Sequence, residues 1–384
     1  MKQKKILVVI PYFIPAYSYW WPVKVAYDYA VKLKERWYDI TVITTDALDK
    51  DNRIKKLEET IDWIKIIRFK NFSNYLAKFH NIYLPLWITK RVKRNIKNYD
   101  IVHMHDFFTY LNVIVGKYCR KNNIPYIIQP HWSANFLPER WKSFIKKIFF
   151  KLFWTKLFEW CKSIIAVSQY EKNNIYYKNK DKIEIIYNGI DTKAIKEYEK
   201  SITERDIKDF KSKFWLNWKK IIFSMWRLHS VKRFDKLIDW SKDILMKNED
   251  YRVVISWPDE WEMDKLKQQI KENWLEWKVI LTWWLYGKEK YIAYWIANVF
   301  TLLSDSEAGA VTVTATDAIY YKLPLVLSKG CNFEFNDDFV KIVDKKSDFE
   351  TAVWMLINKK ANYSFWKEFD MDYLITKLEK IYDK

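Results

Sequence analysis

The chain contains little glycine for its length. Five of its 384 residues are Gly and 22 are Trp, although Gly makes up about 7% of globular proteins. Trp37 and Trp274 each follow a helical run and precede an apolar strand, and Trp257 separates a strand from Pro258. Such turns favour a left-handed backbone, which Gly adopts freely and a bulky residue adopts at a cost of about 1–2 kcal/mol.

We therefore hypothesise that many of these tryptophans come from UGA codons, which some bacterial lineages read as glycine. The alternative is a protein that is naturally rich in tryptophan. The coding DNA decides between them, because TGG codons at positions 37, 226 and 274 would exclude the hypothesis.

Cysteine and long apolar runs are also scarce. Cys119, Cys161 and Cys331 are far apart and show no metal-binding or redox spacing, which indicates a reduced, cytoplasmic protein. No uncharged apolar run reaches the roughly 18 residues of a membrane span. The N-terminal segment MKQKKILVVIPYF resembles a signal peptide, but Pro11 breaks its apolar run and no small-residue cleavage site follows, so we expect a first β-strand.

Positive charge is in excess. Lys and Arg number 67 against 48 Asp and Glu, which gives a net charge of +19. This charge favours an anionic partner such as nucleic acid, a membrane surface or a phosphorylated substrate. Lys, Ile, Asn, Tyr and Phe are all abundant, however, and an AT-rich coding sequence would produce the same excess.

Short apolar strands alternate with helical segments along the chain. We expect strands at 5–11, 39–45, 63–69, 100–106, 125–131, 163–168 and 182–191, and again at 219–225, 251–256, 278–282, 299–304, 323–328 and 340–344. This alternation predicts an α/β protein whose parallel sheets are covered on both faces. Two such sets predict two doubly wound domains, residues 1–195 and 196–364. The amphipathic helix predicted in 365–384 either caps the second domain or packs back on the first.

Two basic residues follow the first strand of the second half. Arg227 and Lys232 come after 219–225, and open α/β sheets bind ligands beyond the carboxyl ends of their strands. An Arg fork with a Lys point charge can hold a diphosphate and stabilise a departing phosphate. The alternative is an ordinary solvated basic face.

Two acids follow a later strand of the same half. Glu307 comes after 299–304, and Asp317 stands ten residues further on. Gly309 permits close backbone approach, and the next residues could open a helix whose free amides bind phosphate oxygens: Ala310, Val311 and Thr312. Two carboxylates near a basic pair suit the hydroxyl groups of a ribose and a sugar, although a helix cap and a surface acid are alternative interpretations.

Histidines and tryptophans mark the strand ends of the first half. His131 ends the fifth predicted strand, and His103 and His105 flank the end of the fourth. A histidine in such a place is a candidate for proton or hydroxyl contacts, although most histidines are structural. Trp20 and Trp21 follow the first strand. Read as Gly-Gly they would form an anion-accepting turn, and as indoles they would fill it.

With Trp read as Gly, the chain resembles the GT-B glycosyltransferases of family 4 along nearly its full length. The segments that carry the resemblance are YSYWWPVKVAYDYAVKLKERWYDITVITTD, DIVHMHDFF, QPHWSA, AVSQYE, EIIYNGIDT, MWRLHSVKRFDKLID, VISWPDEWEMDKL and SDSEAGAVTVTATDAIYYKLPLV. The resemblance implies two Rossmann-like domains that face each other across a cleft, with a nucleotide-sugar donor on the C-terminal domain and an acceptor on the N-terminal one. It also implies retention of anomeric configuration without a cofactor or a catalytic metal, because the basic pair and helix amides neutralise the leaving group.

The resemblance further implies roles for the donor-side residues. Arg227 and Lys232 would hold the donor diphosphate and stabilise the leaving nucleotide. Glu307 would contact the donor sugar, and Asp317 stands where the acid that contacts the ribose is expected. These two acids stand two residues further apart than in the family pattern, and EAGA replaces EGFG. Either the loop carries an insertion or the donor site has drifted.

Roles on the acceptor side follow in the same way. His131 matches the family's active-site histidine near the sugar and the acceptor. Trp20 and Trp21 match the glycine loop beside the phosphates, and we group His105 with them.

The sequence thus predicts a retaining glycosyltransferase that acts on a surface-glycan or lipid-linked acceptor and does not bind nucleic acid. The basic, aromatic segment 139–160 has a helical period. It is either a helix that lies on the anionic inner face of a membrane or an ordinary domain helix. Two other functions stay open, a non-catalytic basic protein that binds nucleic acid or a membrane and a sugar-nucleotide epimerase of the same fold.

Overall fold

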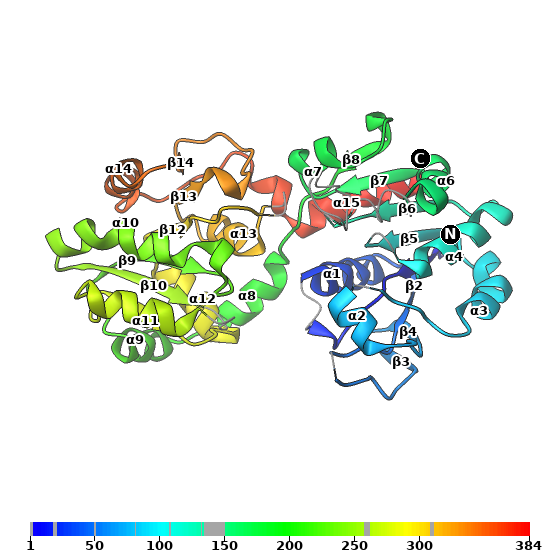
Figure 1. Cartoon of the computed structure of the whole chain (residues 1–384), viewed down its shortest axis with the longest axis horizontal. Coiled ribbons are helices and arrows are strands. Elements are labelled where there is room, and N and C mark those ends of the chain that lie inside the picture. Colours follow the sequence, from blue (N-terminus) through cyan, green and yellow to red (C-terminus); the bar gives the residue numbers. More distant parts are fainter. Residues whose placement is uncertain are drawn as a thin grey trace. The chain divides into compact units, whose positions relative to one another are not determined.

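A computed structural model describes residues 3–384 apart from 18–20, 50, 81, 107–108, 132, 134–149, 257–261 and 308–310. The chain divides into two α/β units (Figure 1), one formed by Met1–Tyr187 with Leu374–Lys384 and the other by Asn188–Tyr373. The division expected after residue 195 lies inside helix α8 (Thr192–Lys200), whereas the structure divides before this helix.

The first unit is built on an eight-stranded sheet with the order β3-β4-β2-β1-β5-β6-β7-β8. Neighbouring strands are parallel except β3, which pairs antiparallel with β4. The strands are β1 (Lys5–Val9), β2 (Asp39–Thr45), β3 (Glu58–Ile61), β4 (Ile64–Phe69), β5 (Ile101–His105), β6 (Tyr126–Gln129), β7 (Ser163–Ala166) and β8 (Ile183–Ile185). The central strands are buried along their length, as expected for parallel strands covered on both faces.

Helices of the first unit cover this sheet. They are α1 (Trp21–Glu35), α2 (Asn74–His80), α3 (Ile88–Asn95), η2 (Ile96–Asn98), α4 (Tyr110–Lys121), η3 (Phe150–Trp154), α6 (Thr155–Trp160), α7 (Gln169–Asn174) and η4 (Lys180–Lys182). Ile88 of α3, Leu111 of α4 and Leu157 of α6 share one hydrophobic core with Val9 and Met104 of the sheet. These three helices therefore cover one face of the sheet.

The second unit is built on a six-stranded parallel sheet with the order β11-β10-β9-β12-β13-β14. Its strands are β9 (Lys220–Met225), β10 (Tyr251–Ser256), β11 (Val279–Thr282), β12 (Val299–Leu302), β13 (Leu325–Ser328) and β14 (Val340–Val343). Its helices are α8, α9 (Glu204–Lys213), η5 (Ser230–Lys232), α10 (Phe234–Lys247), α11 (Met263–Glu272), α12 (Gly287–Ile296), α13 (Val313–Tyr320), η6 (Lys329–Cys331), α14 (Lys346–Leu356) and η7 (Trp366–Phe369). This strand order is that of a doubly wound Rossmann sheet.

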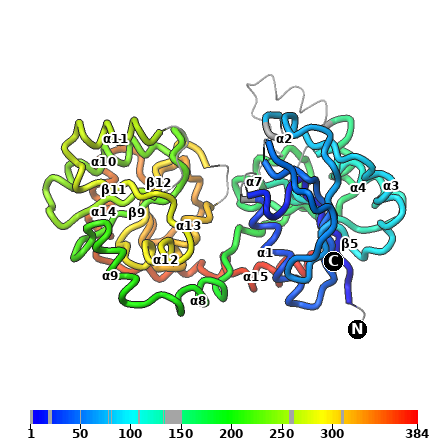
Figure 2. Tube along the Cα trace, turned by 90° about the horizontal axis from the view of Figure 1, so that it is seen from below, coloured from blue at the N-terminus to red at the C-terminus, as the bar shows by residue number. Residues whose placement is uncertain are grey.

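The last helix, α15 (Met371–Asp383), begins in the second unit and packs on the first. Leu374 and Leu378 on this helix are fully buried. The Tyr382 hydroxyl lies 3.0 Å from His103 Nδ1 of β5, and Arg36 pairs with Glu379 at 2.6 Å. Figures 1 and 2 both place the C-terminus among elements of the first unit. The first sheet is thus covered in part by a segment from the other end of the chain.

Tryptophan is over-represented at left-handed backbone positions. Thirteen described non-glycine residues have a positive φ, and six of them are tryptophans: Trp37, Trp63, Trp87, Trp215, Trp218 and Trp274. These six side chains are 64–96% exposed. Trp226 has no positive φ, and Trp154 is a fully buried core residue. The tryptophans therefore fall into more than one structural class.

None of the described helices is both apolar enough and long enough to cross a membrane. Of the basic segment 139–160, the structure describes residues 150–160 only. There Leu152, Phe153 and Trp160 are exposed, whereas Trp154, Leu157 and Phe158 are buried.

Candidate active site

Each sheet reverses its strand order at one point, and the candidate residues gather at these two points. In the second unit the reversal lies between β9 and β12, whose following loops carry Lys232 and Glu307. In the first unit it lies between β1 and β5, which ends at His105. Ligands of open α/β sheets bind at such switch points, beyond the carboxyl ends of the strands.

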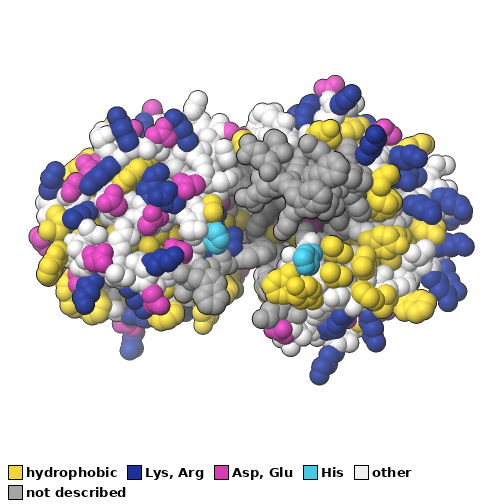
Figure 3. Space-filling model, viewed as in Figure 1, with side chains coloured by type: hydrophobic (Ala, Val, Ile, Leu, Met, Phe, Trp, Pro, Cys, Tyr) yellow, Lys and Arg dark blue, Asp and Glu magenta, His cyan; other side chains and the backbone are white. Residues whose placement is uncertain are grey.

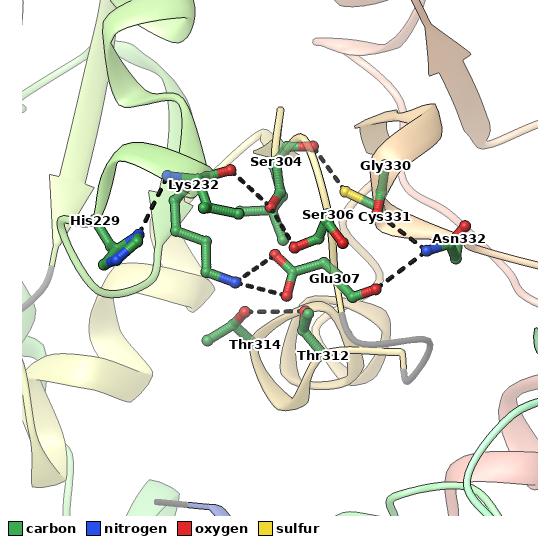
Figure 4. Close-up of polar contacts among 12 residues, drawn as sticks. His229, Lys232, Ser304, Ser306, Glu307, Thr312, Thr314, Gly330, Cys331 and Asn332 are labelled. Carbon is green, nitrogen blue, oxygen red and sulfur yellow. Dashed lines mark hydrogen bonds and ion pairs between the residues drawn. The ribbon is translucent and has the colours of Figure 1, made fainter. Parts of the chain in front are cut away.

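Lys232 and Glu307 form a buried ion pair in the second unit (Figure 4). The Lys232 Nζ lies 2.8 and 2.7 Å from the two carboxylate oxygens of Glu307, and the side chains are 7% and 4% exposed. Lys232 ends the short helix η5, and Glu307 follows β12 after a loop. The sequence-based pairing of a basic residue with a carboxylate at this sheet edge thus corresponds to a direct contact.

Hydrogen bonds between backbone groups hold the two loops together. The amide of Asp305 donates to the Val231 carbonyl at 2.9 Å, and the amide of Glu307 donates to the Gly330 carbonyl at 2.7 Å. The side chain of Asn332 donates to the Glu307 carbonyl at 3.1 Å (Figure 4). A Cβ on Gly330 would lie 2.3 Å from the Ser304 carbonyl oxygen, so only glycine fits here.

The surroundings of Lys232 disfavour its charge. Burial lowers the pKa of the Lys232 ammonium, the nearby positive charge of Arg227 lowers it further, and Glu307 opposes both effects. The Lys232 Nζ lies 4.7 Å from the ring centroid of the Trp226 indole. A buried ammonium held by one carboxylate, beside a guanidinium, is well suited to exchange that carboxylate for the oxygens of a phosphate.

Asp317 has a different partner. It lies on α13, and its carboxylate pairs with Lys290 of α12 at 2.6 Å while its own side chain is 3% exposed. The N-terminus of α13 is capped by Thr312, whose Oγ1 accepts a hydrogen bond from the Ala315 amide. Val311 and Thr312 are buried, and Gly309 and Ala310 lie outside the described residues. The structure therefore brings Glu307, but not Asp317, into contact with Lys232.

Three histidines form a buried cluster in the first unit. His105 Nδ1 and His131 Nε2 are 2.8 Å apart, so one imidazole donates to the other. The rings of His103 and His105 stack with centroids 4.1 Å apart. Burial lowers the pKa of His103 and of His131 to about 3 and holds the pKa of His105 well below its ordinary value. All three are therefore neutral at physiological pH.

Sequence reasoning missed two neighbours of these histidines. The Tyr12 hydroxyl donates to Asp106 Oδ2 at 3.0 Å, and Asn112 Nδ2 donates to the His105 and Asp106 carbonyls at 3.0 and 3.2 Å. Asp106 and His131 both have a positive φ, a conformation that often marks functional sites. Asp106 comes directly after β5 and Tyr12 comes three residues after β1, and this position beyond a strand end is the signal that could have identified them.

The predicted loop at Trp20 and Trp21 falls in part outside the described residues. Trp20 lies outside the described residues, and Trp21 is the first residue of α1, whose side chain is likewise not described. Within the described ranges no group of three or more His, Cys, Asp or Glu is placed to hold a metal ion.

Two Rossmann-like units with candidate sites at their switch points define the class of GT-B proteins. A model of Glycosyltransferase Family 4 matches residues 23–194, and a model of glycosyl transferases group 1 matches residues 206–341. The chain therefore belongs to the family 4 glycosyltransferases, and the protein is a glycosyltransferase.

Solved structures share this fold over the whole chain. Anabaena Alr3699/HepE in complex with UDP and glucose has a TM-score of 0.69 at 16% identity. The alignment covers 98% of this chain and 99% of the HepE chain. A glycosyltransferase from Rickettsia africae has a TM-score of 0.71 at 17% identity, with 100% and 98% covered. Sucrose-phosphate synthase from Thermosynechococcus elongatus has a TM-score of 0.67 at 12% identity, with 99% and 98% covered. No curated protein sequence matches the chain.

Proposed function

We propose that the enzyme transfers a sugar from a nucleotide-sugar donor to a surface-glycan or lipid-linked acceptor with retention of anomeric configuration. The observation that carries the proposal is the buried Lys232–Glu307 pair at the switch point of the second sheet, beside Arg227. The UDP and glucose named for the HepE complex favour a sugar nucleotide as the donor.

The basic pair supplies charge where the reaction needs it. Transfer breaks the bond between the anomeric carbon and a phosphate oxygen and forms a bond from that carbon to the acceptor's hydroxyl oxygen, whose proton passes to the departing diphosphate. Negative charge therefore develops on this diphosphate as it leaves. Lys232 and Arg227 stabilise this charge, and preorganised charges of this kind lower the barrier most in a site with little water. When Lys232 turns to the phosphates, the Glu307 carboxylate becomes free to accept hydrogen bonds from sugar hydroxyls. The reaction in this form uses no metal and no cofactor.

The neutral histidines define what the first unit contributes. His131 contacts the transferred sugar and the acceptor as a neutral hydrogen-bonding group, because burial keeps its pKa low. His105 holds His131 in orientation through the 2.8 Å contact. A contact of Asp317 with the ribose requires its carboxylate to exchange Lys290 for a hydroxyl group.

Donor hydrolysis tests the proposal without knowledge of the acceptor. The purified protein is incubated with a panel of nucleotide sugars, and release of nucleoside diphosphate is measured. We expect turnover of at least one donor and a loss of about 100-fold or more in Lys232→Ala. The matched control is Lys247→Ala, which removes an exposed ammonium from the end of α10 and should leave turnover unchanged.

Two results would contradict the proposal. If the folded protein turns over no donor, a nucleotide sugar is not its substrate. If Lys232→Ala and Lys247→Ala lose turnover equally, Lys232 has no specific role. Once an acceptor is found, the anomeric configuration of the product, read by proton NMR against that of the donor, tests retention separately.

A further inference from the structure

An apolar surface of the first unit is left uncovered. Five hydrophobic side chains within the segment after β4 are 41–65% exposed, and we call them the apolar patch: Phe72, Tyr75, Phe79, Ile82 and Leu86. Figure 3 shows hydrophobic side chains gathered on this unit, around the position that α2 has in Figure 1. Trp87, which follows Leu86 and is 82% exposed, is left out of the patch, so the patch does not depend on the Trp-for-Gly question.

The residues of the apolar patch belong to one compact piece of backbone. Tyr75 and Phe79 lie one turn apart on α2, and their ring centroids are 4.9 Å apart. The amide of Phe72 donates to the Leu84 carbonyl at 3.0 Å, and the amide of Leu86 donates to the Lys70 carbonyl at 2.9 Å. These bonds fix the segment, so the exposed side chains belong to a folded surface. A cluster of this kind on a folded surface marks an interaction site.

Charge within the segment that carries the apolar patch is of one sign, although Arg91 of α3 pairs with Glu58 of β3 at 3.4 Å. Residues 70–97 contain seven Lys and Arg and no Asp or Glu. Four of these cations lie on α3, which turns Ile88 and Val92 into the core. Lys90, Lys93 and Arg94 are exposed. Apolar side chains bordered by exposed cations match the interface of an anionic lipid bilayer, whose headgroups attract the cations while the rings enter the acyl boundary.

The apolar patch is also connected to the candidate acceptor side. Tyr83, buried within the same segment, packs on Tyr12 with ring centroids 5.5 Å apart, and Tyr12 donates to Asp106 at the end of β5. The segment is therefore linked through Tyr12 to Asp106, the residue that follows His105 on the proposed acceptor side.

We propose that the apolar patch, with the basic helix α3, docks the enzyme on an anionic membrane surface. The reason for docking rests on the proposed function, since a lipid-linked acceptor is presented at a membrane. Binding itself does not require catalysis. The site differs from the segment 139–160, for which the sequence left a membrane-facing helix and an ordinary domain helix both open.

Vesicle flotation of the full-length protein tests the proposal. We expect the protein to float with vesicles of phosphatidylcholine mixed with phosphatidylglycerol, less with phosphatidylcholine alone, and less at high salt. The double variant Tyr75→Ser/Phe79→Ser should lower the bound fraction about tenfold. The matched control Tyr176→Ser/Tyr198→Ser removes two rings that are 55% and 48% exposed elsewhere and should bind like the parent. Thermal melts confirm that the variants are folded.

A second variant tests the charge. Lys90→Gln/Lys93→Gln should lower binding to the anionic vesicles, with little change on neutral ones. Vesicle binding that is equal in the parent and in Tyr75→Ser/Phe79→Ser would overturn the proposal, as would a parent that does not float. A concentration-dependent dimer that this variant abolishes, without vesicle binding, would assign the patch to a second copy of the chain and would also overturn it.

Donor hydrolysis separates this proposal from the proposed function. The Tyr75→Ser/Phe79→Ser variant should release nucleoside diphosphate at the parental rate in the absence of vesicles. If the parent floats but hydrolyses no donor, the membrane site stands and the proposed function fails. If the parent hydrolyses a donor but does not float, the proposed function stands and the membrane site fails.

Discussion

At the scale of single residues, the left-handed tryptophans conflict with their own backbone. Trp37 and Trp274 have φ values of 69° and 58° and are 83% and 82% exposed. Each follows the end of a helix, where the Cβ clashes with the neighbouring carbonyl and the indole gains no burial in return. The glycines that close packing requires, such as Gly330, are present as glycine. Gly287 has a positive φ with open space around it and is also glycine, so the hypothesis that the exposed tryptophans stand in for glycine stays a prediction for the coding DNA to decide.

Substitution by glycine tests the conflict. We expect Trp37→Gly and Trp274→Gly each to raise the free energy of unfolding by about 1 kcal/mol, because the cost of a Cβ at positive φ disappears. The controls Trp37→Ala and Trp274→Ala keep the Cβ and should bring no such gain. Urea unfolding of the four variants measures the difference. Equal effects of Gly and Ala would show that the indole, and not the backbone, determines stability there.

At the scale of elements, periodicity predicted the strands well because each apolar run is buried in a parallel sheet. The expected strands 39–45 and 251–256 coincide with β2 and β10, and most of the others agree to within about two residues at each end. One exception is 182–191, of which only β8 (Ile183–Ile185) is a strand. The other is β3, an edge strand that was not expected. Three of its four residues are polar, and its two-residue turn to β4 is Asp62-Trp63, both at positive φ. Such turns are usually recognised from Asp-Gly, so a tryptophan in place of the glycine removes the signal.

The candidate sites were predictable to the extent that strand ends determine them. Lys232 and Glu307 follow strands that are neighbours in the sheet, so their contact follows from topology. Asp317 could not be placed in this way, since a residue inside a helix faces whichever side the helix turns, here toward Lys290. The contact of His103 with Tyr382 joins residues 279 positions apart, and no local pattern indicates it.

The buried histidines at the ends of β5 and β6 make the fold sensitive to acid. Their pKa values fall from 6.5 to about 3 on folding for His103 and His131. Between these values the unfolded chain binds more protons than the folded one, so stability is fully present above pH 6.5 and decreases as the pH falls. At pH 5 each of the two should cost about 2 kcal/mol.

Urea unfolding between pH 7.5 and about 5 measures this loss. In His103→Gln one titrating group is absent, so we expect a shallower decrease in stability with falling pH, even if the variant is less stable at neutral pH. A slope that is the same in the parent and in His103→Gln would contradict the burial of a neutral imidazole at this position.

At the scale of the whole molecule, the two ends of the chain depend on each other. The first unit takes its final segment, Leu374–Lys384, from beyond the complete second unit. This segment contributes apolar side chains to the first unit, and Tyr382 reaches the histidine cluster. Through His103, which stacks on His105, the histidine cluster and the far end of the chain share one packed region, so disturbing α15 should affect both stability and activity.

Leu378→Ala tests this dependence. The side chain is fully buried on α15, and its truncation should lower the free energy of unfolding by about 2–5 kcal/mol, because it leaves a cavity in a packed core. Lys380→Ala, an exposed change on the same helix, is the control and should shift stability by less than about 0.5 kcal/mol. Unfolding followed by circular dichroism separates the two, and donor hydrolysis by the folded Leu378→Ala protein shows whether the histidine cluster is disturbed. If Leu378→Ala and Lys380→Ala have the same free energy of unfolding, α15 does not stabilise the first unit, and its packing against that unit is contradicted.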